Sequence, residues 1–333
     1  MKSKRRNTIN TIIKLCIAAG LIWAIYRQVF ARKDADELWQ ALVSHFEFPN
    51  LLWLCLVLCL VPVNIAFEAL KFGKLVKAFS TLSFWRLFQS IMAGNTIAIF
   101  TPNRVGEYGG RVLFVPPEHN WKAVIATMVG SLAQLLVLLS MGLLGALWFS
   151  INVLELDRMV LALGLCLGSL LIGLLIFAFF NVDLLVPLIQ RIPGIQRFNR
   201  YLKHLLVLKR YSKQELSEVL LMAFLRYLTY SLQYYFLLKF YAIPVPLAIG
   251  LSGVATIFFV QASIPLPPVL GLLARGEIAL FIWGMFGTSE VDILAATFTL
   301  FVINIALPAL IGMGFIVQTN VLKTLGYENT VEK

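Results

Sequence analysis

Long apolar runs separated by short polar stretches make up most of the chain. A helix that crosses a bilayer needs about 20 mostly apolar residues, and several runs reach this length. They cover about residues 9–30, 50–70, 123–149, 159–180, 217–240 and 292–318. The first run follows a basic N-terminus, as in a signal peptide, but it is long enough to span and no small-residue cleavage motif follows it. We therefore expect a retained first helix and an all-α integral membrane fold with about six spanning helices.

Two further apolar segments, 84–100 and 247–264, are each followed by a stretch with proline and glycine. The distribution of basic residues indicates whether these segments cross the membrane, because cytoplasmic loops carry an excess of lysine and arginine. With the N-terminus inside, a straight crossing of the first segment would place the basic loop at 191–213 outside. If both segments enter the membrane and turn back, the basic loops are inside and the acidic pairs at 155–157 and 290–292 are outside. We therefore predict two re-entrant hairpins, with both termini in the cytoplasm.

The two predicted hairpins enter from opposite faces, which gives the chain the organisation of an inverted repeat. Repeat A covers about residues 50–149 and repeat B about residues 217–318. Inverted repeats with broken helices near the membrane midplane are a recurring design of transporters. We expect one polytopic membrane domain over 1–322 and a short cytoplasmic tail at 323–333. Between the repeats, the basic stretch 181–216 is expected at the cytoplasmic interface, either as a helix on the anionic inner leaflet or as a connecting loop.

Composition agrees with a chain embedded in lipid. Of its 333 residues, 59% are apolar and 14% are charged, against about 25% charged in ordinary soluble domains, and the mean hydropathy is +0.84. The net charge of +11 comes from short loops beside apolar runs, which indicates contact with anionic lipid headgroups rather than nucleic acid. Four cysteines inside apolar runs are expected to be small buried side chains: Cys16, Cys55, Cys59 and Cys166. No histidine or cysteine pair has the spacing of a metal site, and we expect no cofactor.

The tip of the first predicted hairpin, TPNRVGEYGGR at 101–111, combines proline, glycine and charge at membrane depth. Non-helical backbone is tolerated there when it is buried in protein or lines a wet cavity. Arginine suits a phosphate, because its planar fork donates to two oxygens at once. An ordinary interfacial loop would also carry such charges, but their coincidence with proline and glycine favours a binding site. The candidate residues are Asn95, Thr101, Pro102, Arg104, Gly106, Glu107 and Arg111.

The second predicted hairpin carries Pro267, Gly271, Arg275 and Glu277. Two interpretations are equally open for this segment. It forms the other half of a binding site, or it is a proline-rich turn with an Arg–Glu pair on the surface.

Polar residues inside the predicted spans are further candidates. Arg226 lies about 15 Å inside its predicted helix at 1.5 Å per residue, where a charge costs about 2.5–3.5 kcal/mol on insertion scales. Two interpretations of Arg226 are open: it lines a functional cavity, or its side chain extends to the cytoplasmic interface. Tyr230 and Gln233 follow on the same face of the predicted helix. Residues expected to line an interior cavity or to join helices by hydrogen bonds are Gln134, Gln261 and Asn304. Residues expected at a solvated or lipid-facing helix end are Glu68, Lys71, Lys74 and Lys77.

Two runs resemble a known family. AGNTIAIFTPNRVGEYGGR at 93–111 resembles the N…P-x-R-x-G-E…R signature of the lysylphosphatidylglycerol synthase transmembrane-region family, and SIPLPPVLGLLARGE at 263–277 resembles its second hairpin. The resemblance covers about residues 10–318 and places the signature on Asn95, Pro102, Arg104, Gly106, Glu107 and Arg111, then on Pro267, Gly271 and Glu277. Four residues, LLAR, separate Gly271 from Gly276, so the second hairpin departs from the usual compact glycine-rich form.

The resemblance implies a flippase-like membrane region. In the multiple peptide resistance factor this region translocates aminoacylated phosphatidylglycerol and is joined to a soluble aminoacyl-transferase domain. The present sequence stops about 15 residues after its last predicted helix. We therefore do not expect synthase activity.

The sequence predicts a translocator of a lipid or lipid-linked headgroup, such as an anionic or aminoacylated phospholipid, in the bacterial cytoplasmic (inner) membrane. Two alternatives stay open: a non-catalytic membrane subunit that supports a lipid or cell-envelope synthase, and a membrane enzyme that modifies a lipid headgroup. No pair of nucleophile and base is visible, so we expect no enzyme activity. Expected partners are membrane phospholipid, anionic inner-leaflet lipids and either a second copy or a partner synthase, but not nucleic acid.

Overall fold

The computed structural model describes residues 2–29, 35–101, 104–184, 186–187, 203–263 and 268–326. Among these residues every regular element is a helix and no strand occurs, which confirms the all-α prediction. Several predicted features lie outside the described residues: Pro102, Pro267, the stretch 188–202 of the basic segment and 327–333 of the tail.

The helices follow the predicted apolar runs. In chain order they are α1 (Lys2–Val29), α2 (Ala35–Ser44), α3 (Phe48–Val76), α4 (Phe84–Ala98), α5 (Gly106–Val112), α6 (Asn120–Phe149), α7 (Arg158–Phe180), α10 (Lys213–Phe240), α11 (Leu247–Ala262), α12 (Pro268–Gly284), α13 (Glu290–Phe301), α14 (Leu307–Gln318) and α15 (Val321–Thr324). Short 3-10 or π segments are η2 (Pro117–His119), η3 (Ser150–Leu154), η4 (Val182–Leu184), η6 (Lys203–Arg210) and η7 (Val302–Ala306).

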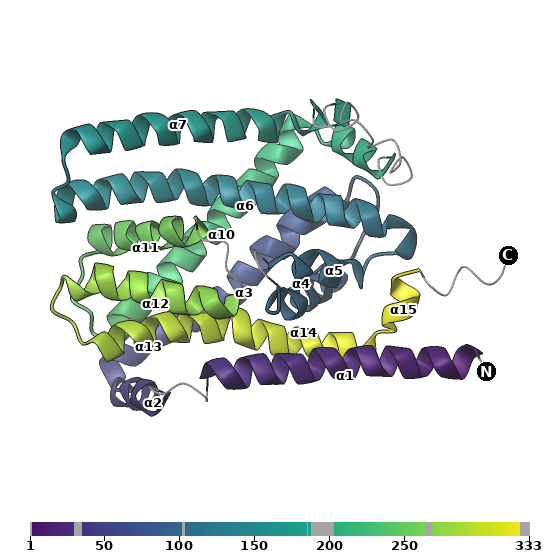
Figure 1. Ribbon diagram of the computed structural model, residues 1–333, viewed down its shortest axis with the longest axis horizontal. Helices are drawn as coiled ribbons and strands as arrows, with labels where there is room; N and C mark the ends of the chain where they lie inside the picture. The colour runs from purple at the N-terminus through teal and green to yellow at the C-terminus, as the bar shows by residue number, and fades with distance from the viewer. Residues whose placement is uncertain are drawn as a thin grey trace.

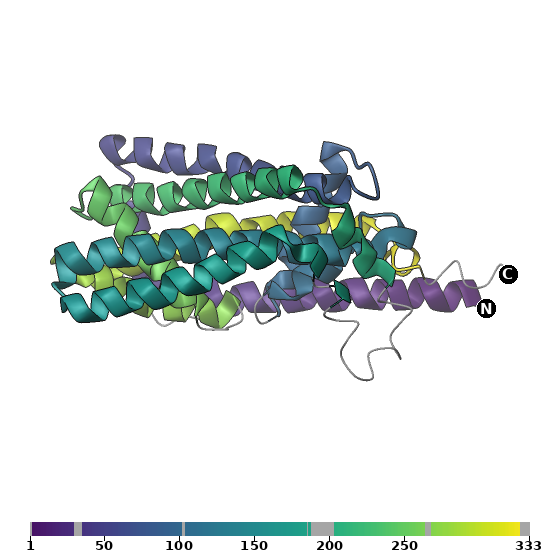
Figure 2. The same cartoon turned by 90° about the horizontal axis from the view of Figure 1, so that it is seen from above.

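Five helical stretches are long and apolar enough to cross a membrane: Thr8–Tyr26, Phe48–Val76, Pro117–Leu154, Arg158–Phe180 and Glu290–Gln318. They match five of the predicted spans, and the chain is a multi-pass helical membrane protein. The remaining predicted span is α10, whose 28 residues give it sufficient length. Arg226, Gln233 and several tyrosines interrupt its apolar run. Leu221, Phe224 and Leu228 of α10 are exposed on the surface of the bundle, whereas Gln233, Tyr234 and Leu238 are buried. Figures 1 and 2 show α10 lying along α3.

Local sequence explains where two of the long helices begin. The Ser212 hydroxyl accepts the backbone N–H of Glu215 at 3.2 Å, while the Glu215 carboxylate accepts the backbone N–H of Ser212 at 2.9 Å. This reciprocal pair is a capping box and starts α10. The Asp157 carboxylate accepts the backbone N–H groups of Met159 and Val160 and starts α7 in the same way.

Two pairs of short helices form hairpins inside the bundle. The helices α4 and α5 have 15 and 7 residues, and α11 and α12 have 16 and 17. At 1.5 Å per residue none of them reaches the roughly 30 Å thickness of a bilayer core. Figure 1 shows α4 and α5 toward the end of the bundle where α1 begins, whereas α11 runs inward from the opposite end, where α6 turns into α7, and α12 runs back toward that end. Their re-entry into a membrane and the division into inverted repeats stay predictions.

Glycine lets the first hairpin close tightly. A Cβ atom on Gly106 would lie 2.5 Å from the carbonyl oxygen of Ile97, and one on Gly110 would overlap the carbonyl oxygen of Ala93. The two glycines are four residues apart and lie on one face of α5, the spacing that permits close helix contact in membranes. The sequence of this tip therefore fixes how near α5 can approach α4.

One expectation about the surface needs correction. All four cysteines are exposed, so their expected burial is wrong; in a membrane, lipid covers that surface.

Within the basic segment, η6 packs on the bundle. Its residues Val207 and Leu208 are buried, and η6 contacts α6 and η4. Arg210 and Tyr211 donate to the carbonyl oxygens of Ala78 and Leu75, at 3.0 Å and 3.2 Å, which ties this segment to the end of α3. Its location at the cytoplasmic interface stays a prediction.

The glycine contacts predict a difference between two adjacent positions. We expect Gly110→Ala to lower the stability of the protein by about 1–3 kcal/mol, because the added methyl group separates α5 from α4. Gly109→Ala is the matched control, since a Cβ there meets nothing within 4 Å and alanine favours the helix by up to about 1 kcal/mol. Thermal unfolding of both purified variants in detergent measures the difference. Equal unfolding temperatures would contradict the close packing.

Candidate functional site

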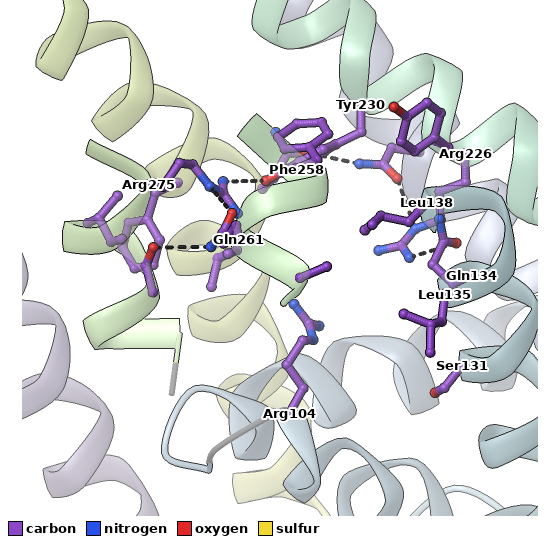
Figure 3. A pocket seen from close by; sticks show the side chains of 18 residues that line it. Arg104, Ser131, Gln134, Leu135, Leu138, Arg226, Tyr230, Phe258, Gln261 and Arg275 are labelled. Atoms are coloured by element: carbon purple, nitrogen blue, oxygen red, sulfur yellow. Dashed lines mark hydrogen bonds between the residues drawn. The ribbon is translucent and has the colours of Figure 1, made fainter. Parts of the chain in front are cut away.

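A cavity of about 560 Å³ lies in the middle of the bundle, between the two hairpins. Three arginines line it: Arg104 at the tip of the first hairpin, Arg226 in α10 and Arg275 in α12 of the second hairpin. Figure 3 shows Arg104 pointing into the space that separates Arg275 from Arg226. Tyr230 and Gly271 also line the cavity, so residues singled out from distant parts of the sequence meet there.

The side chain of Arg104 is held in the cavity wall by its own hairpin. Its Nη2 donates to Oδ1 of Asn95 at 2.6 Å, and its Nε donates to Oε2 of Glu107 at 3.2 Å. The backbone of Arg104 has a left-handed φ of 58°, which few residues other than glycine adopt. The Thr101 hydroxyl supports the turn by accepting the backbone N–H of Gly106 at 2.7 Å. The predicted candidates of this hairpin therefore form one connected group.

A network of buried ions lies behind the first hairpin and centres on Glu68 of α3. Its Oε1 accepts from Arg111 at 2.5 Å, and its Oε2 lies 2.7 Å from Nζ of Lys71 and 3.0 Å from Nη1 of Arg226. Arg111 also pairs with Glu107. Glu68, Lys71 and Arg111 are almost completely buried, and burial of such charges is tolerated only when they neutralise one another.

This network corrects the prediction of a solvated helix end for Glu68 and Lys71. The helix α3 continues to Val76, so its charged turn lies beneath α5 and α10 rather than in a headgroup layer. Further along, Lys74 is partly exposed and pairs with Glu218, as expected for an accessible helix end.

Arg226 connects the network to the cavity. Besides Glu68, it donates to Oδ1 of Asn64 at 3.1 Å and to Oε1 of Gln134 at 3.3 Å. Asn64 in turn donates to Oδ1 of Asn304 at 2.9 Å, and Asn304 lies in the π-helical segment η7. Such π segments often occur at functional sites. Gln134 and Asn304, together with Gln261, line the cavity as predicted.

The second hairpin holds Arg275 at the other side of the cavity. Its Nε donates to Oε1 of Gln261 at 2.7 Å, and its Nη1 donates to the Tyr230 hydroxyl at 3.1 Å. The guanidinium also lies over the ring of Phe258, at 5.6 Å from the centroid, a favourable cation–π geometry. Gln261 donates to the carbonyl oxygen of Gly271 at 3.1 Å, which ties α11 to α12 near the hairpin tip.

Gln233 and Glu277 belong neither to the cavity lining nor to the groups that hold its arginines. Gln233 is fully buried and donates to the carbonyl oxygen of Val57 at 3.1 Å, so it joins α10 to α3. Glu277 is exposed on α12 and does not line the cavity.

Sequence reasoning missed Asn64 and misplaced Glu68. The signal was present, because Asn64, Glu68 and Lys71 are spaced i, i+4 and i+7 on one face of an otherwise apolar run. A polar stripe at helical spacing in such a run indicates an inward-facing surface rather than a helix end.

The network predicts a strong effect of removing its central charge. We expect Glu68→Gln to destabilise the protein by about 3–5 kcal/mol, because it leaves buried cations without a counter-charge. Glu118→Gln, at an exposed acid, is the control and should change stability little. Thermal unfolding in detergent measures both. Adding Lys71→Gln to Glu68→Gln should recover part of the loss; no recovery would indicate that packing rather than charge balance is responsible.

Comparison with known proteins is consistent with this architecture. The family model described as the lysylphosphatidylglycerol synthase transmembrane region matches residues 11–312. No curated protein and no solved structure matches the chain. The matched region contains α3, α10 and both hairpins, and hence every residue described above as lining the cavity. The chain therefore belongs to the family of lysylphosphatidylglycerol synthase transmembrane regions.

Proposed function

We propose that this protein translocates the headgroup of a phospholipid or lipid-linked substrate across the bacterial cytoplasmic membrane. The observation that carries the proposal is the cavity with three arginines between two hairpins that start at opposite ends of the bundle. A polar headgroup cannot cross the apolar bilayer core without paying for its desolvation. A cavity with fixed charges and amides at mid-bundle replaces the lost water contacts, so it lowers that barrier.

The same cavity has an apolar wall suited to the rest of a lipid. Leu272 and Phe301 line the cavity and also belong to an apolar cluster with Leu21 of α1 and Ile99 of the first hairpin. A lipid with its headgroup among the arginines can place its acyl chains along this wall, since burial of apolar surface requires no fixed direction. The arrangement separates a polar site for the headgroup from an apolar path for the chains.

The proposed orientation places both termini in the cytoplasm and the hairpins as re-entrant segments. It rests on the positive-inside rule and on hairpin helices that are too short to span. The loop before α6 and the loop before α13 then face opposite sides of the membrane.

Transport should depend on the cavity arginines. In liposomes that contain the reconstituted protein and a labelled phospholipid, we expect Arg104→Ala and Arg226→Gln to slow movement between leaflets by about tenfold or more, because each removes a charged hydrogen bond worth about 1.5–3 kcal/mol. Arg158→Gln is the control, because Arg158 is exposed at the start of α7. Glu107→Ala should slow movement as well, since Glu107 holds Arg104.

Two other results would redirect the proposal. Movement no faster than in protein-free liposomes, for several lipids, would contradict translocation. Co-purification of a synthase whose activity survives all of these cavity variants would favour the supporting-subunit alternative.

The orientation is testable by labelling single cysteines in a background without the four native ones. We expect Glu118→Cys to react with a membrane-impermeant reagent only from the cytoplasmic side, and Glu290→Cys only from the outside. Both positions are exposed, and α6, α7, α10 and the second hairpin lie between them in the chain. Reaction of both from the same side would overturn the proposed topology.

A further inference from the structure

The charges of the cavity carry an inference about the substrate, which rests on the proposed function and deepens it. We infer that the cavity selects a phospholipid headgroup of net negative charge, binds its phosphate at Arg275, and disfavours an aminoacylated headgroup of net positive charge. The wall of the cavity contains three arginines and no carboxylate among its described residues. The undescribed segments next to it in the chain, 102–103 and 264–267, contain no acidic residue either.

The three arginines are not equivalent. Arg104 and Arg226 each pair with a carboxylate that lies behind the cavity wall, Glu107 at 3.2 Å and Glu68 at 3.0 Å. Arg275 is 9% exposed, and no described aspartate or glutamate lies within the 4 Å of an ion pair. Its two described side-chain hydrogen bonds go to neutral groups.

An almost buried cation without a counter-charge is unfavourable, because apolar surroundings replace the water that would stabilise it. An incoming phosphate supplies the missing negative charge. Gln261 and Tyr230 fix Nε and Nη1 of Arg275, and neither bond uses Nη2. The guanidinium is thus held in one orientation by neutral partners, as expected for a group prepared to bind an oxyanion.

The two carboxylates that pair with the lining arginines do not offer a site for a cation. Glu68 is 4% exposed and is shared by Lys71, Arg111 and Arg226. Glu107 is shared by Arg104 and Arg111. An aminoacyl ammonium group would therefore lie among arginines with no available acid, and like charges in poorly solvated surroundings repel strongly.

Binding measurements test this inference separately from transport. Purified protein in detergent is titrated with short-chain phosphatidylglycerol and with short-chain lysylphosphatidylglycerol, which share the phosphate and differ in net charge. We expect the anionic lipid to bind at least about tenfold more tightly, the ratio that corresponds to about 1.4 kcal/mol. Arg275→Gln should weaken binding of the anionic lipid by about tenfold or more, and Arg275→Lys should weaken it less.

A second variant changes the charge while keeping the size. Gln261→Glu places a carboxylate 2.7 Å from Nε of Arg275, where it supplies the negative charge that the phosphate would otherwise bring. We expect this variant to bind the anionic lipid more weakly. The ratio of the affinities for the anionic and the lysyl lipid should therefore become smaller. The matched controls are Gln318→Glu and Arg158→Gln, both at exposed positions. They should leave the ratio of the two affinities unchanged. Monodisperse elution of each variant shows that it is folded.

The outcomes distinguish the two proposals. Equal affinities, tighter binding of the lysyl lipid, or an unchanged ratio in Gln261→Glu would overturn the headgroup inference even if both lipids are translocated. A clear preference for the anionic lipid without any transbilayer movement would support the binding site and contradict the translocator.

Discussion

A single buried carboxylate holds the centre of this bundle together. Glu68 of α3 contacts Lys71 in its own helix, Arg111 of the first hairpin and Arg226 of α10. None of these ions can be buried alone, because an isolated charge in apolar surroundings is strongly destabilising. The attraction of Glu68 for these three cations therefore fixes α3, α5 and α10 relative to one another. The tip of the first hairpin is built on this base through Glu107, which connects Arg111 to Arg104.

The second hairpin is attached in a different way. Among the described residues no ion pair joins the two hairpins, and their tips meet through an apolar cluster that includes Ile99 and Leu272. Apolar contacts are not directional, so they can be rearranged without exposing a buried charge. The first hairpin is thus held by ion pairs, and the second by apolar packing and by the hydrogen bond from Arg275 to Tyr230 of α10. Arg275 shows the contrast between the two hairpins most clearly, because its partners are neutral groups and an aromatic ring rather than a carboxylate.

The predictability of the candidate site differs between residues for physical reasons. Arg104, Glu107 and Arg111 were identifiable because their partners lie within one short segment, where spacing alone sets the distances. Arg226 was identifiable because a lone charge inside an apolar run is costly. Charge at the end of an apolar run is ambiguous, since both a headgroup layer and a buried network accept it, and this is why Lys71 was assigned to the wrong environment.

Apolar length along the chain was sufficient to predict the long helices. A bilayer demands helices of a certain length and apolarity, and the runs that meet or miss that length can be counted in the sequence. Which residues contact one another depends on how these helices pack. Arg226 and Gln233 share one face of α10, yet the first reaches the cavity and the second contacts the carbonyl oxygen of Val57. The environment of each residue depends on which groups of α3 lie opposite it. These contacts join residues that are far apart in the chain, so local spacing does not predict them.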